Sequence, residues 1–309
     1  MDQFLTVLGV VSPIFTAVAL GLFAKRKATL STEEVRGLQQ FAVKFGLPCV
    51  VFNACLTAQI GTEALATMVL AVVPLMISVL WAFRARGKAF PYFNLPMLFS
   101  SHETGMLGIP LTIILFGAAE SYRMGVLDLA QAIVAFPTIA ILSSNTGENP
   151  SLGQILKGVL ASPLLIMSLL GLGLNLSGAA AWMDQVGVGT ILTESTGFLA
   201  QPVSALMLFS VGYNFSINRE NRKDILRISG IFLGWFCLTG LVSQGILCLL
   251  PNTAPVSRWV LLLYFLLPGS YLAPGLGRCE KDSVLASGVC SLLTAVTLVV
   301  FCVISTFVA

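Results

Sequence analysis

Long apolar runs, separated by short polar breaks, decide what this chain can fold into. The chain is 56% hydrophobic and only 10% charged, whereas soluble domains carry about 25% charged residues. Because so few charged residues cannot cover a water-facing surface, we expect a lipid bilayer to be the solvent. A helix needs about 20 apolar residues to cross a bilayer, so a chain of 309 residues is long enough for about ten crossings and no soluble domain.

We predict an all-α polytopic membrane protein with ten transmembrane helices, delimited by the apolar runs and their breaks. The polar stretch "SSNTGENPS" separates the fifth span from the sixth. It divides the chain into residues 1–144, a short cytoplasmic link at 145–154, and residues 155–309. The predicted spans are 4–24, 34–58, 63–83, 91–117, 122–143, 153–176, 190–215, 225–250, 256–277 and 283–308.

The distribution of basic residues supports this list of spans. Of the seventeen Lys and Arg residues, fourteen fall in the loops that follow odd-numbered spans or within the first five residues of the next span. Only Arg123 and Arg258 follow even-numbered spans, and Lys44 lies inside the second span. Loops rich in Lys and Arg stay in the cytoplasm, so we expect a multi-pass protein of the cell (inner) membrane with both termini outside. A net charge of +3 does not indicate a nucleic-acid partner.

The second half of the chain resembles the first. The stretches "SPIFTAVALGL" from Ser12 and "SPLLIMSLLGL" from Ser162 begin with Ser-Pro and end with Leu-Gly-Leu, and the next span of each half contains a proline, Pro48 or Pro202. Five spans in each half is an odd number, so two copies would lie inverted in the membrane. Chance similarity between apolar segments is the alternative, but inverted repeats are a common architecture of secondary transporters.

Helix breakers interrupt the fourth and ninth spans at matching positions. Such residues free backbone amides and carbonyls in the membrane, which is tolerated only where protein or a water-filled cavity satisfies them. The exposed N-terminal end of a half-helix also attracts anions. A simple proline kink with tight glycine packing is the alternative. The breakers are Gly105, Gly108 and Pro110 in the fourth span, and Pro268, Gly269, Pro274 and Gly275 in the ninth.

Glu103 is the most informative single residue, because a carboxylate inside a span is costly unless it is protonated, paired or hydrated. It either pairs structurally with His102 or Lys44, lies nearer the interface, or binds a coupling cation, which would be sodium or a proton. His102 is adjacent in sequence and therefore points elsewhere on a helix, so we expect it to be an interfacial or packing residue and not half of a proton relay. Asp128 and Glu194 lie near outer span ends and are expected to be solvated or interface residues.

Lys44 lies some ten residues into the second span, four residues before Pro48. It either extends to the cytoplasmic face or places a positive charge near the broken helices, where it would pair with Glu103 or hold a carboxylate substrate. Asn53, Thr104, Ser270 and Tyr271 add neutral hydrogen-bonding groups near the breaks.

The residue types needed for catalysis are scarce. A single histidine leaves little for a Ser-His or zinc arrangement, and no P-loop is present. The seven cysteines form no C-x-x-C motif and lie mostly in apolar runs, where they behave as small hydrophobic residues. We therefore expect no enzyme and no cofactor other than a coupling Na⁺ or H⁺.

Three motifs give the chain a family resemblance: "GLPCVVF", "ETGMLGIPLTIILFG" and "LGRCEKDSVLASGV" resemble the auxin efflux carrier family. The resemblance implies two inverted five-span repeats crossing at the fourth and ninth spans, organic-anion substrates such as auxin or dicarboxylates, elevator-type transport and a homodimer. The short central link resembles bacterial members.

The same resemblance carries some roles over to single residues. The crossover asparagine of the family falls on Glu103 and the following threonine on Thr104, and the prolines fall on Pro110 and on Pro268 or Pro274. The glutamate departs from the family pattern. "ETGM" is instead similar to the sodium-liganding motif of the bile acid:sodium symporters, which are related in fold.

The prediction from the sequence is a secondary active transporter of a small organic anion, of the carboxylate or dicarboxylate type, working by an elevator-like mechanism in the bilayer. A ligand sensor or binding protein with a transporter fold is the alternative. Glu103 is the predicted cation-coupling residue and a candidate sodium ligand. The residues predicted to bind substrate are Lys44, Asn53, Thr104, Gly105, Pro110, Pro268, Ser270, Tyr271 and Pro274.

Overall fold

The computed structural model describes residues 2–58, 62–144, 161–215, 221–250 and 253–308. The regular elements in these ranges are almost entirely helical. The predicted link at 145–154 lies outside the described residues. The elements are α1 (Asp2–Lys27), α2 (Thr32–Phe41), the π-helical turn η1 (Ala42–Gly46), α3 (Leu47–Leu56), α4 (Thr62–Ala85), α5 (Leu95–Leu98), the π-helical turn η2 (Thr104–Gly108), α6 (Ile109–Phe116), the 3₁₀ turn η3 (Ala118–Glu120), α7 (Ser121–Ser144), α9 (Pro163–Leu176), α10 (Ala179–Gln185), α11 (Val188–Ala200), α12 (Val203–Asn214), α13 (Arg222–Leu249), α14 (Pro255–Leu266), the 3₁₀ turn η4 (Ala273–Leu276) and α15 (Glu280–Val308).

Within the described residues, five helical stretches are individually long and apolar enough to cross a membrane, and α9 with α10 makes a sixth, bent by 77°. The predicted fourth and ninth spans contain only shorter apolar helices, Thr104–Phe116 and Pro255–Leu266, because their breakers divide them. The helical, multi-pass membrane fold is confirmed, whereas the count of ten spans stays a prediction. The five long stretches are Glu63–Ala85, Ala118–Leu142, Val188–Asn214, Arg222–Leu249 and Glu280–Val308.

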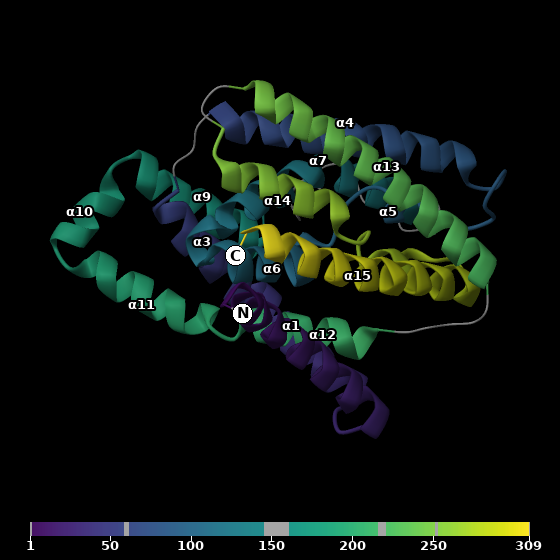
Figure 1. The fold of residues 1–309 in the computed structure, drawn as a ribbon, viewed down its shortest axis with the longest axis horizontal. Coiled ribbons are helices and arrows are strands. Elements are labelled where there is room, and N and C mark those ends of the chain that lie inside the picture. The colour runs from purple at the N-terminus through teal and green to yellow at the C-terminus, as the bar shows by residue number, and fades with distance from the viewer. Residues whose placement is uncertain (1, 59–61, 145–160, 216–220, 251–252, 309) are drawn as a thin grey trace.

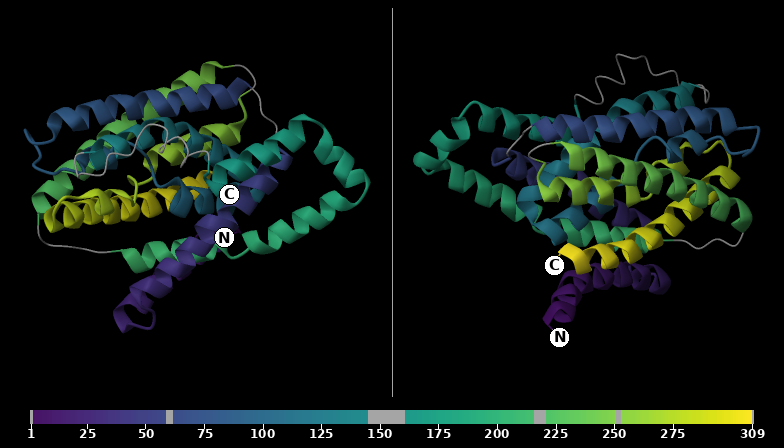
Figure 2. Two further views of the ribbon diagram at one scale, coloured as in Figure 1. Left: turned by 180° about the vertical axis from the view of Figure 1, so that it is seen from behind. Right: turned by 45° about the horizontal axis from the view of Figure 1, so that its top comes forward.

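The helices form two groups that lie side by side (Figures 1 and 2). We call the first the central bundle; it consists of α4 to α7 and α13 to α15. We call the second the flanking bundle; it consists of α1 to α3 and α9 to α12. The two bundles meet where α12 packs on η2 and α6, where α1 packs on α15, and where α3 packs on α7.

Helix pairing within the flanking bundle crosses between the two halves of the sequence. Helix α1 packs along α12, and α3 packs along α9. In the predicted spans, the first therefore contacts the seventh and the second contacts the sixth. A duplicated pair of helices, in which each copy packs on the helices of the other copy, would produce this reciprocal pattern. The inverted repeat itself stays a prediction.

Two glycines allow the close packing of α1 on α12. A Cβ atom added at Gly21 would overlap the carbonyl oxygen of Phe209, and one added at Gly212 would overlap the carbonyl oxygen of Val18. Small residues at helix contacts let backbones approach closely in membranes. The absence of a side chain at Gly21 and Gly212 therefore permits this contact.

Substitution of Gly212 by alanine is expected to destabilise the protein by about 1–3 kcal/mol, because the backbone of α1 would have to move away. Thermal denaturation of the purified protein in detergent measures the effect. The matched control is Gly234→Ala in α13, where an added Cβ meets nothing within 4 Å and alanine favours the helix. A Gly212→Ala protein that melts no lower than this control would contradict the packing argument.

Candidate functional site

The breaks in the two interrupted segments lie against each other. The backbone N–H of Glu103 donates to the carbonyl oxygen of Pro268 at 2.9 Å, and the N–H of Ser270 donates to the carbonyl of Ser101 at 3.1 Å. These bonds form an isolated antiparallel bridge between His102 and Gly269. Each broken segment thereby satisfies backbone groups that the other has freed, as a non-helical stretch inside a membrane requires.

Glycine and proline at the breaks suit this contact. A Cβ atom at Gly269 would overlap the carbonyl oxygen of Leu98, so a larger residue would push the two segments apart. Pro110 lies near the start of α6, directly after the π-helical turn η2, and it lacks the N–H that an uninterrupted helix would use there.

The carboxylate of Glu103 joins both breaks. It accepts the N–H of Met106 at 3.3 Å, within its own segment, and the N–H of Tyr271 at 2.8 Å, in the opposite segment. Glu103 is also the residue that precedes the helical turn η2 and caps it. Its partners are therefore backbone amides, in place of the His102 or Lys44 pairing considered from the sequence.

Asp128 is a second carboxylate at the same place. Its Oδ1 atom accepts the hydroxyl of Thr104 and, at 3.0 Å, the amide of Gln131. The expectation that Asp128 is a solvated residue near the outer end is wrong, because it lies two turns into α7 and faces the crossing segments. Asp128 and Gln131 are three residues apart and so share one face of the helix. This spacing is the feature of the sequence that indicates a shared polar face for Asp128 and Gln131.

Gln131 is the centre of a polar network that holds the first break. Its Oε1 atom accepts the N–H of His102 at 2.8 Å and the hydroxyl of Tyr264 at 3.1 Å. Its Nε2 atom donates to the carbonyl of His102 at 3.1 Å and to Asp128. The side-chain amide of Gln131 thus satisfies both the N–H and the carbonyl of His102, as a neighbouring β-strand would, and His102 lies outside any helix. Nothing in the linear sequence links Gln131 to residues 29 positions away.

His102 is a packing residue, as expected. Its side chain is buried, and Nδ1 lies 3.1 Å from the carbonyl oxygen of Leu267. The imidazole ring contacts Phe236 and Tyr264, with centroid distances of 4.4 and 4.6 Å, both edge to face.

A cavity of about 870 Å³ lies at the crossing and is lined by both bundles. Most of the wall is apolar, with charged and hydrogen-bonding groups at a few points, as in small-molecule sites generally. Sequence reasoning missed Arg36, Asp128, Gln131 and Thr294 among its lining residues. The predicted site residues that line it are Lys44, Glu103, Thr104, Gly105, Ser270, Tyr271 and Pro274.

Three predicted site residues do not line this cavity. Asn53 lies between α3 and α11, where its Oδ1 atom accepts the hydroxyl of Thr196 at 2.6 Å. Pro110 is buried in α6, and Pro268 contributes its carbonyl to the contact with Glu103. A helix places neighbouring residues on different faces, so proximity to a break in sequence does not place a side chain in the cavity.

Charges of opposite sign line the cavity from different bundles. Arg36 on α2 and Lys44 on η1 belong to the flanking bundle, whereas Glu103 and Asp128 belong to the central bundle. In the described part of the chain, no ion pair within 4.0 Å joins these cations to these carboxylates. The positive groups are therefore available to an anion inside the cavity, and the carboxylates to a cation.

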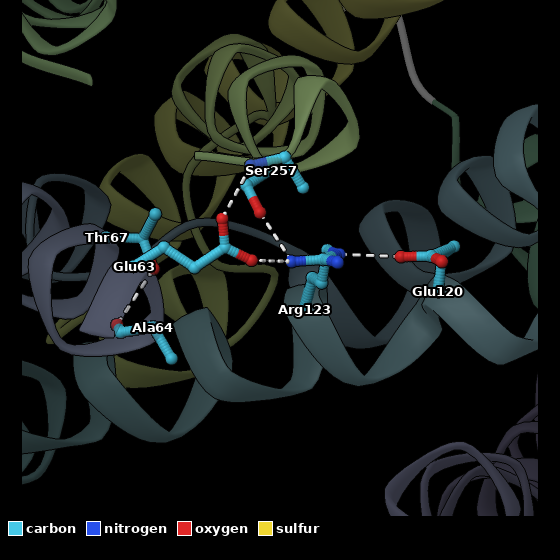
Figure 3. A network of polar contacts seen from close by, with 7 residues as sticks. Glu63, Ala64, Thr67, Glu120, Arg123 and Ser257 are labelled. Atoms are coloured by element: carbon cyan, nitrogen blue, oxygen red, sulfur yellow. Dashed lines mark hydrogen bonds and ion pairs between the residues drawn. The ribbon is translucent and has the colours of Figure 1, made fainter. Parts of the chain in front are cut away.

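A separate ionic network ties three helices of the central bundle together at the beginnings of α4, α7 and α14 (Figure 3). Arg123 contacts Glu63 at 2.5 Å and Glu120 at 2.6 Å, and it donates to the hydroxyl of Ser257 at 2.5 Å. Glu63 also accepts the N–H of Ala254 at 2.7 Å. None of these residues lines the large cavity.

Comparison with known proteins finds a family match for the first half of the chain. Residues 6–150 match the family described as "Membrane transport protein". This match confirms the resemblance to the auxin efflux carrier family over that part. A relative from Methanothermobacter thermautotrophicus, described as an "Uncharacterized transporter", is 26% identical over 244 residues, which cover 75% of this chain and 76% of the relative.

Proposed function

Since residues 6–150 carry the sequence pattern of the membrane transport protein family, we propose that the protein is a secondary active transporter of a small organic anion. The substrate is of the carboxylate or dicarboxylate type. The cavity at the crossing of the broken segments is the substrate site, and the transporter works as a homodimer in the cell membrane.

The observation that carries this proposal is the polarity of the cavity. Arg36 and Lys44 offer positive charge to a carboxylate, and the apolar wall accommodates the remainder of a small organic molecule. Arg36 lies at the start of the predicted second span and Lys44 lies inside it, in the part of the sequence predicted to face the cytoplasm. A cavity open to these residues belongs to the inward-facing state of an alternating-access cycle.

An anion beside Glu103 and Asp128 needs a compensating positive charge, because two carboxylates and an anion repel each other strongly where water is scarce. A sodium ion or a proton supplies it. Hard cations prefer oxygen ligands, and each carboxylate has more acceptor positions than the N–H and O–H donors occupy. Glu103, with Asp128 and the hydroxyl of Thr104, therefore fits a coupling cation.

An elevator-like movement suits the division of the site between two bundles. The central bundle contains the crossing and both carboxylates, so it would carry the bound solute and cation as a unit. The flanking bundle, which supplies Arg36 and Lys44, would remain fixed. Ion and substrate would then move together past a stationary wall.

The test is uptake into proteoliposomes. Carboxylates that raise the melting temperature of the purified protein, with and without sodium, are selected and then offered as labelled substrates under imposed sodium or pH gradients. We expect concentrative uptake under one of the two gradients. Stabilisation by carboxylates without uptake under either gradient would identify a ligand sensor and contradict the proposal.

Removal of the Lys44 charge tests the anion site. Lys44→Gln is expected to raise the substrate concentration for half-maximal uptake about 10-fold or more, because a hydrogen bond to a charged group contributes about 1.5–3 kcal/mol. Lys27→Gln is the matched control, since it removes an exposed charge at the end of α1, outside the cavity. Equal effects of the two substitutions would show that Lys44 does not contact the substrate.

A further inference from the structure

Basic residues gather at one end of the central bundle, where α4 ends and where α13 and α15 begin, at the right of Figure 1. We call this surface the basic rim. It comprises eight basic and three acidic residues, an excess of five positive charges. Its basic members are Arg84, Arg86, Lys88, Arg222, Lys223, Arg227, Arg278 and Lys281, and its acidic members are Asp224, Glu280 and Asp282.

Two of the three carboxylates are committed to other donors. Asp224 accepts the hydroxyl of Tyr92 at 2.5 Å. Asp282 is buried and accepts the backbone N–H of Phe93 at 3.3 Å and that of Arg278 at 2.9 Å. These acids fix the loop between α4 and α5 and the start of α15. Their negative charges are already subtracted in the excess of five, so the rim keeps a net positive charge.

The guanidinium groups rest on aromatic rings. The Arg278 and Arg86 groups lie 3.9 and 4.9 Å from the centroid of one ring, Phe93, and the Arg227 group lies 4.9 Å from that of Phe90. Partial burial and the nearby charge of Arg278 lower the pKa of Arg86. Like charges on one ring repel each other, so an anion that contacts both would relieve the repulsion.

In the described ranges, no carboxylate oxygen lies within 4.0 Å of the Arg86 or Arg227 guanidinium. Stacking on a ring orients a guanidinium without using its N–H groups. Arg86 also donates one of its five N–H groups to the carbonyl oxygen of Phe93 at 3.4 Å. The fork of donors of a guanidinium matches the oxygens of a phosphate. The rim thus presents oriented donors of the type that binds phosphate.

Exposed apolar side chains border the basic groups. Trp81 and Leu80 near the end of α4 are 37% and 54% exposed, and Leu226 on α13, next to Arg227, is 52% exposed. The ring of Trp81 meets Phe90 edge to face, with centroids 6.3 Å apart. Helices α4, α13 and α15 are all long enough to cross a membrane, so the rim lies where headgroups meet acyl chains.

We propose that the basic rim binds the phosphate of an anionic phospholipid, with the acyl chains against Trp81 and Leu226. Basic sites between the ends of membrane helices take anionic headgroups in this way. A lipid fits better than a soluble phosphate because cationic and apolar groups are adjacent on one surface. The proposal requires the membrane location alone and does not depend on the transported substrate.

Native mass spectrometry of the purified protein with phosphatidylglycerol and phosphatidylcholine tests the proposal. We expect the wild-type protein to bind phosphatidylglycerol more tightly. Arg227→Gln with Arg278→Gln should weaken that binding about 25-fold, since each basic residue near an anionic surface contributes about fivefold. The matched control is Arg26→Gln with Lys27→Gln, which removes two charges from the end of α1 and should leave the binding unchanged.

Three results would overturn the proposal. Equal affinity of the wild-type protein for the two lipids would exclude headgroup recognition. Equal losses in the two double variants would indicate diffuse attraction to all basic residues. Displacement of phosphatidylglycerol by millimolar glycerol 3-phosphate or inorganic phosphate would assign the rim to a soluble anion. Both lipids are measured on every variant, so a general loss of stability, which would weaken the binding of both lipids alike, would not imitate the expected result.

Discussion

Replacement of Arg123 by methionine is expected to destabilise the protein by about 3 kcal/mol or more and to lower its melting temperature by roughly 5–10 °C. Arg123 and Glu63 expose only 15% and 13% of their side chains. Without the guanidinium, the Glu63 carboxylate stays mostly buried and uncompensated, and removal of one partner from a buried ion pair costs about 3–5 kcal/mol.

A double variant separates the charge from the packing. Glu63→Leu combined with Arg123→Met removes both charges, so it should melt above Arg123→Met alone, because no uncompensated carboxylate remains. Arg26→Met, which removes an exposed arginine at the end of α1, is the control for loss of a basic residue and should change the melting temperature little. If Arg123→Met melted like Arg26→Met, the network of Figure 3 would not stabilise the bundle.

The crossing of the two segments followed from local chemistry, which a sequence records directly. Proline lacks an N–H and glycine lacks a Cβ, so residues such as Pro110 and Gly269 indicate a helix break from their residue type alone. Glu103 stood out for a similar reason, because a carboxylate in an apolar run needs partners. The sequence could not name these partners, since the N–H of Tyr271 is 168 residues away along the chain.

The composition of the cavity depended on tertiary geometry. Asp128 was assigned by its distance from the end of a span, yet the direction in which α7 turns its polar face decides where the side chain goes. Arg36 lies in α2, whose amphipathic character shows in the sequence, but its place in the cavity depends on how α2 packs on α12. Asn53 does not line the cavity for the same reason, because its side chain contacts Thr196 on α11.

Alanine at position 103 is expected to abolish uptake and to destabilise the protein. It would leave the N–H groups of Met106 and Tyr271 without an acceptor, and each unsatisfied buried donor costs about 1–3 kcal/mol. A loss of about 3 kcal/mol lowers the equilibrium constant for the crossed geometry about 100-fold. Uptake into proteoliposomes and thermal denaturation measure the two effects, and Glu194→Ala, an exposed glutamate in α11, is the matched control.

Glutamine at the same position separates the cation from the scaffold. Its carbonyl oxygen still accepts one of the two N–H groups, so Glu103→Gln should retain more stability than Glu103→Ala, while the negative charge is gone. If Glu103 binds the coupling cation, this variant equilibrates the substrate across the membrane without responding to a sodium or pH gradient. A full response to the gradient in Glu103→Gln would leave Glu103 with a purely structural role, and Asp128 would become the remaining carboxylate able to hold the cation at the crossing.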